Sequence, residues 1–116
     1  MAKAKHVQYA VVYKTDGTTQ ETTPVNGKTF DLHELQQAIG GGWLESLLPA
    51  DKKCRQMYAA GEGCSRSPAL PRNPHTQSVC DMRVYALNGY APDWCVCGDI
   101  VAVYKRPAVE SGGGKL

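Results

Sequence analysis

The chain lacks a long apolar run, a long run of one charge and a cysteine pattern typical of a disulfide framework. No stretch approaches the ~20 apolar residues that a membrane-spanning helix needs. The first residues are basic but no apolar segment follows them, so we expect no signal peptide. The net charge of +2 is too small to indicate a nucleic-acid binder by itself. These absences favour a soluble, cytoplasmic protein without a membrane partner.

Recognisable catalytic motifs are also missing. The sequence contains no Gly-x-Ser-x-Gly, Walker loop, His-Glu-x-x-His or deaminase pattern, and it has only three histidines. Cys80 and His75 are one conceivable nucleophile and base, but a core cysteine and a loop histidine explain them more simply. The run 40–42 of three glycines follows a predicted helix instead of opening one, which argues against a phosphate cradle. We therefore expect no catalysis and no cofactor.

Five cysteines occur at irregular spacing, at positions 54, 64, 80, 95 and 97. Cys95-x-Cys97 could supply two thiolates to zinc, with the other cysteines or His75 completing the site. A structural zinc site usually shows a second closely spaced pair, and none is present here. We therefore predict free thiols in a reducing cytosol and no bound metal.

What is present indicates one α+β domain over residues 5–106, followed by a flexible tail over 107–116 that is rich in glycine. Alternating apolar residues predict a half-buried strand over 7–14, and Asp16-Gly17 predicts a hairpin turn after it. Further strands are expected over 19–25, 43–48, 55–60 and 95–104. Segment 75–87 fits a helix or a strand, with 84–87 favouring a strand. The expected fold is a small mixed or antiparallel sheet with one or two short helices on one face.

The best-marked element is a short helix that begins after Asp31. Asp31 can cap it, and Glu34 is placed to complete a capping box. Phe30 can pack on Leu35 as a hydrophobic staple, and Leu32, Leu35 and Ile39 share one helical face. The three glycines at 40–42 then predict the end of the helix.

The passage 30–45 combines this helix, which contains a Gln, with a glycine pair, an aromatic residue, an aliphatic residue and a Glu. Gly61-Glu62-Gly63, Pro71-Arg72-Asn73-Pro74 and Gly98-Asp99-Ile100-Val101 follow. This order resembles a family of uncharacterised small proteins, a domain of unknown function, encoded by phages, plasmids and large DNA viruses. The resemblance implies a virus or mobile element as the setting, without implying a chemistry. The chain departs from the family at Ala59-Ala60-Gly61, where an Asn is usual.

Two loops contain residue types that a core does not need. Loop 64–75 contains three prolines with Arg72 and Asn73, and loop 88–94 contains Tyr90 and Trp94. Binding residues concentrate in loops on rigid scaffolds, and Arg, Tyr and Trp are enriched at binding hot spots. We therefore predict a partner-binding surface made by Arg72, Asn73, Tyr90 and Trp94. Burial of Trp94 in the core is the competing interpretation.

The sequence thus predicts an accessory protein that binds a protein partner, or a second copy of itself as a homo-oligomer. A nucleic-acid-binding accessory protein is the alternative. It is suggested by basic residues at 52, 53, 55, 66, 72 and 83, and by aromatic residues at 85, 90, 94 and 104 that could stack on bases.

Overall fold

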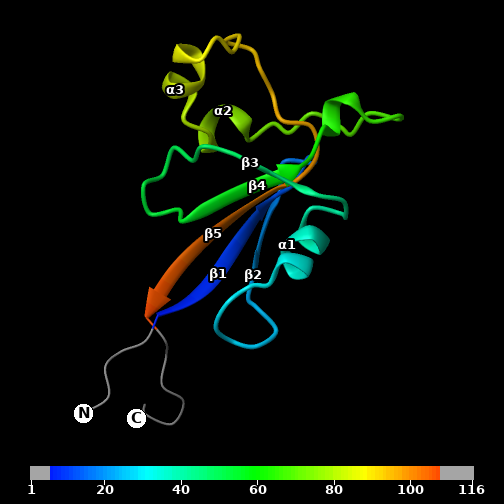
Figure 1. Ribbon diagram of the computed structural model, residues 1–116. Coiled ribbons are helices and arrows are strands. Elements are labelled where there is room, and N and C mark those ends of the chain that lie inside the picture. The colour runs from blue at the N-terminus through cyan, green and yellow to red at the C-terminus, as the bar shows by residue number, and fades with distance from the viewer. Residues whose placement is uncertain (1–5, 108–116) are drawn as a thin grey trace, which may run out of the picture.

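The computed structural model describes residues 6–107, in which a five-stranded antiparallel sheet is flanked by short helices (Figure 1). The strands are β1 (His6–Tyr13), β2 (Thr19–Thr22), β3 (Leu44–Ser46), β4 (Gln56–Ala60) and β5 (Ile100–Pro107). Their order across the sheet is β2-β1-β5-β4-β3. The expected α+β fold is confirmed. Residue 5 and all but the first residue of the predicted tail 107–116 lie outside the described residues.

The two longest strands, β1 and β5, pair along their whole lengths in the middle of the sheet. Their register runs from His6 opposite Pro107 to Tyr13 opposite Ile100. Residues 100–103 of β5 are fully buried. Because successive side chains of a strand point to opposite faces, β5 contributes to two hydrophobic cores, one on each side of the sheet.

One core lies under helix α1 (Leu32–Ala38). Leu35 and Ile39 pack there against Val12, Val101 and Val103. The capping box is confirmed, since Asp31 accepts a hydrogen bond from the backbone nitrogen of Glu34, and the Glu34 side chain accepts one from that of Asp31. Gly40, Gly41 and Gly42 all have positive φ and end the helix as predicted. Of the three residues predicted to share one helical face, Leu35 and Ile39 are buried, whereas Leu32 at the start of the helix is 63% exposed.

The other core lies under the second half of the chain, which contains a 3₁₀ turn η1 (Gly63–Ser65) and helices α2 (Thr76–Val79) and α3 (Met82–Leu87). Tyr85 and Cys80 pack there with Met57, Ile100 and Ala102. The preference for a strand over 84–87 was wrong. Asp81 caps α3 by accepting from the backbone nitrogen of Val84, at 3.4 Å.

Three predicted strands are shorter or shifted in the structure. β2 ends at Thr22, β3 covers three residues, and β5 starts at Ile100 rather than at residue 95. Segment 95–99 is instead irregular apart from one bridge residue, Cys97, and it passes beside η1 before entering the sheet. Within residues 6–107, no helix is both long and apolar enough to span a bilayer.

Candidate functional site

The two loops predicted to bind a partner lie side by side. Arg72 donates from Nη2 to the carbonyl oxygen of Asp93 at 3.1 Å. Gln77 donates from Nε2 to the carbonyl oxygen of Trp94 at 2.7 Å. The backbone nitrogen of Asn73 donates to the oxygen of Val96, also at 2.7 Å. These bonds join loop 64–75 and α2 to segment 93–97, so they form one continuous surface.

Asn73 does not belong to the accessible part of this surface. It is 1% exposed, and its Nδ2 donates to the carbonyl oxygens of Tyr13 and Gly98 at 2.8 and 2.9 Å. Its Oδ1 accepts from the backbone nitrogen of His75 at 2.9 Å. The prediction that Asn73 belongs to the partner-binding surface is therefore wrong. The side chain ties the end of β1 to the approach to β5 by satisfying buried backbone groups.

Trp94 and Tyr90 belong to a cluster of three aromatic rings built on Tyr85. Ring centroids are 4.5 Å apart for Tyr85 and Trp94, 4.9 Å for Tyr85 and Tyr90, and 5.1 Å for Tyr90 and Trp94. Tyr85 is buried, and its hydroxyl accepts from the backbone nitrogen of Leu48 at 2.9 Å. Burial raises the pKa of Tyr85. Tyr85 is therefore the support for the cluster, and Tyr90, at 44% exposed, is its accessible edge.

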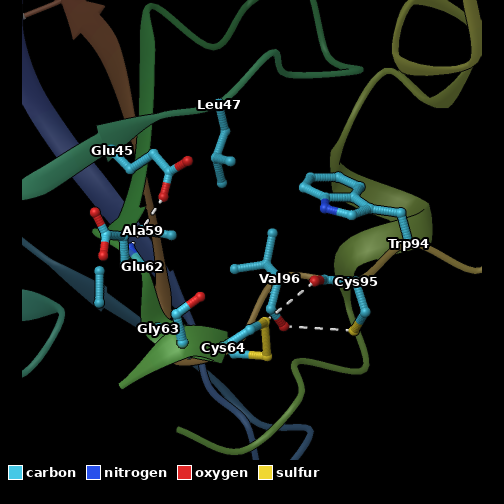
Figure 2. A pocket seen from close by; sticks show the side chains of 12 residues that line it. Glu45, Leu47, Ala59, Glu62, Gly63, Cys64, Trp94, Cys95 and Val96 are labelled. Atoms are coloured by element: carbon cyan, nitrogen blue, oxygen red, sulfur yellow. Dashed lines mark hydrogen bonds between the residues drawn. A yellow bond between two sulfur atoms is a disulfide. The ribbon is translucent and has the colours of Figure 1, made fainter. Parts of the chain in front are cut away.

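A pocket of about 240 Å³ opens beside Trp94 (Figure 2). Figure 2 shows the indole of Trp94 on one side and the carboxylate of Glu45 on the other, with Leu47 and Val96 between them. One oxygen of Glu45 accepts from the backbone nitrogen of Glu62 at 3.3 Å. The pocket thus has apolar walls, one aromatic ring and two acidic residues, Glu45 and Glu62. Glu45 and Leu47 lie far from the predicted loops in sequence, and sequence reasoning missed both.

The floor of the pocket includes a disulfide between Cys64 and Cys97, which contradicts the prediction of free thiols for these two residues. The bond ties η1 to the segment that enters β5. Gly63 permits the close approach, because a Cβ there would lie 2.3 Å from the carbonyl oxygen of Cys97. Since disulfides persist in oxidising compartments, the bond also removes the argument for a reducing cytosol.

The remaining three cysteines are free thiols. Cys54 and Cys80 are buried, and Cys95 is half-buried. Burial raises the pKa of the Cys80 thiol to about 12, so it stays protonated and unreactive at neutral pH. Among residues 6–107, no three histidine, cysteine or acidic side chains come close enough to hold a metal ion.

In comparisons with known proteins, no family model, no curated protein and no solved structure matches the chain.

Proposed function

We propose that the protein is a binding module without catalytic activity that docks a basic side chain of a protein partner into the Trp94 pocket. The observation that carries the proposal is the pairing of an indole ring with a carboxylate across one pocket (Figure 2). Lysine and arginine have an apolar stem and a cationic head, so they match both features. The head can pair with Glu45, and the stem can lie along Leu47 and Val96.

Charge at the pocket supports a cationic ligand. Within the described residues, the one salt bridge joins Arg106 to Glu21, at 3.2 Å, so Glu45 has no basic partner there. Glu45 and Glu62 are the two charged residues that line the pocket, and both are acidic.

The rim of the pocket has the composition of a binding hot spot. Tyr90 is 44% exposed and its ring packs against that of Trp94, and the exposed Arg72 bonds to the backbone of Asp93, the residue before Trp94. The loops that present them are fixed by the bonds of Arg72, Asn73 and Gln77 and by the disulfide, which lowers the entropy lost on binding. Aromatic and arginine anchors on a rigid surface favour a protein partner.

A peptide selection tests this proposal. The immobilised protein is offered a library of random peptides, and selected peptides are sequenced. We expect enrichment of a single lysine or arginine next to apolar or aromatic residues. The peptides selected on the wild type are then measured for binding to Glu45→Gln, which keeps the size of the side chain and removes its charge. They should bind that variant about tenfold more weakly, as expected for a charged pair that is partly desolvated.

Glu21→Gln is the matched control, because it removes the same charge from an exposed residue of β2 outside the pocket. Equal loss of binding in both variants, or selection of peptides without basic residues, would contradict the proposal. Sedimentation of the protein alone distinguishes a second copy of the chain from a foreign partner. We further propose, from the resemblance of passage 30–45 to proteins of phages and mobile elements, that this binding serves an accessory role during infection.

A further inference from the structure

A second charged surface lies at the other end of the sheet. β1 begins and β5 ends at the end of the sheet farthest from α2 and α3 (Figure 1). His6, Lys53, Arg55 and Lys105 line a pocket of about 340 Å³ there, and none of the described residues that line it is acidic. We call these four residues the basic pocket. None of them lines the Trp94 pocket.

The backbone places the four side chains together. His6 is opposite Pro107 and Gln8 is opposite Lys105, so His6 and Lys105 are diagonal neighbours on the same face of the sheet. The backbone nitrogen of Arg55 donates to the oxygen of Val103 at 2.7 Å, which holds Arg55 beside the same stretch of β5. The basic pocket is therefore formed by three segments that are distant in sequence.

The positive charges of the basic pocket are not neutralised within the described part of the chain. No acidic side chain there lies within 4.0 Å of the charged nitrogens of Lys53, Arg55 or Lys105. Asp51 is near in sequence, but its Oδ1 accepts from the backbone nitrogen of Lys53, at 2.8 Å. Arg106 follows Lys105 and pairs with Glu21, while its guanidinium lies 4.4 Å from the ring centre of Tyr9. Like charges gathered without a counter-ion favour an anionic ligand.

We propose that the basic pocket binds the phosphate backbone of a nucleic-acid strand. Lysine and arginine are the residues that contact phosphate oxygens most effectively. Because the cations come from three separate segments around an open pocket, they suit successive phosphates of a strand better than one enclosed phosphate. This site is independent of the proposed protein-binding pocket, so either can fail without the other.

Fluorescence anisotropy with a labelled single-stranded DNA oligonucleotide tests the proposal, at several salt concentrations. With three permanent cations engaged, the logarithm of the association constant should fall with the logarithm of salt at a slope of about −2, at ~0.7 per phosphate contact. Lys53→Gln with Lys105→Gln should weaken binding at low salt by about tenfold and reduce the slope by about 1.4. Inorganic phosphate serves as a competitor.

The matched control is Lys14→Gln with Lys28→Gln, which removes two positive charges that do not line the basic pocket. Circular dichroism checks that both double variants are folded. Equal weakening by the two double variants would overturn the proposal, because it would show non-specific attraction to net charge. The proposal would also be overturned if the oligonucleotide did not bind. The same holds if inorganic phosphate, at a concentration equal to that of the oligonucleotide, displaced it completely, because that result would identify a site for small anions.

Discussion

Asp31 shows how one side chain fixes the start of an element. Its carboxylate accepts from the backbone nitrogen of Glu34 at 2.8 Å, and the Glu34 carboxylate bonds to the backbone nitrogens of Asp31 and Val25, at 3.0 and 2.7 Å. The capping box therefore stabilises both the start of α1 and the turn that precedes it. The sequence predicts it because the interaction is local, with partners three residues apart.

Replacing Asp31 with alanine should lower the free energy of unfolding by about 1 kcal/mol, because backbone donors at the helix start lose their acceptor. Urea denaturation measures the change. His33→Ala, at an exposed position in the same helix, is the control and should change the midpoint little. If both variants unfold at the wild-type midpoint, the capping box does not stabilise the fold.

Asn73 shows where residue-level prediction fails. The sequence marks it as a polar residue in a proline-rich loop, which fits either a contact for a partner or an internal brace. The choice depends on carbonyl oxygens of Tyr13 and Gly98, which are 60 and 25 residues away. No local pattern indicates those partners, so the surface interpretation was favoured and was wrong.

At the scale of elements, those with local signals were predicted and those fixed by distant contacts were not. β1, the turn after it and α1 carry alternation, Asp-Gly and a capping box in their own residues. For α3, the short run Val84–Leu87 suits a strand, and the cap at Asp81 was overlooked. Segment 95–99 contains apolar residues because it packs beside α2 and α3. From the sequence alone, such buried residues cannot be told from those of a buried strand.

The disulfide between Cys64 and Cys97 links η1 to the entry of β5 across 33 residues of separation. Cys64→Ser should lower the free energy of unfolding by about 2–4 kcal/mol, because the open chain gains conformational freedom when unfolded. Cys95→Ser is the control, since it lies in the same segment and is free. Thermal unfolding without reductant measures both. Equal midpoints for wild type and Cys64→Ser would show that the bond does not form in solution.

At the scale of the whole molecule, several buried acids keep their protons in the folded state. Burial raises the pKa of Cys80 to about 12, and burial also raises the pKa values of Cys54, Tyr85 and Tyr104. Above pH 9 the unfolded chain therefore binds fewer protons than the folded chain. By linkage, stability falls as pH rises through this range.

We expect the midpoint of thermal unfolding to fall between about pH 9 and pH 11, where unfolded cysteine and tyrosine ionise. Tyr104→Phe removes one of these groups, a half-buried phenol, and should make this decline shallower, whatever its effect at neutral pH. A midpoint that stays constant over the range, in both proteins, would contradict the burial of these groups.

The candidate site is visible only at this largest scale. The sequence predicts that two loops contain binding residues, and the structure brings these loops together through Arg72 and Gln77. The pocket needs Glu45 and Leu47 as well, which come from β3 and the residues after it, at the far edge of the sheet. The basic pocket likewise needs the β1–β5 register. Both sites are products of tertiary structure, so residue types alone could not identify them.

The most direct test of the proposed function uses the emission of Trp94 while a selected basic peptide is titrated. The chain has two tryptophans, so Trp43→Phe leaves Trp94 as the single reporter. We predict that its emission shifts in a saturable way as the peptide binds. Adding Glu45→Gln should raise the peptide concentration at half saturation about tenfold, as expected for the loss of a partly desolvated charge pair. An emission that stays constant while an independent assay shows the peptide bound would place the binding site elsewhere and contradict the account.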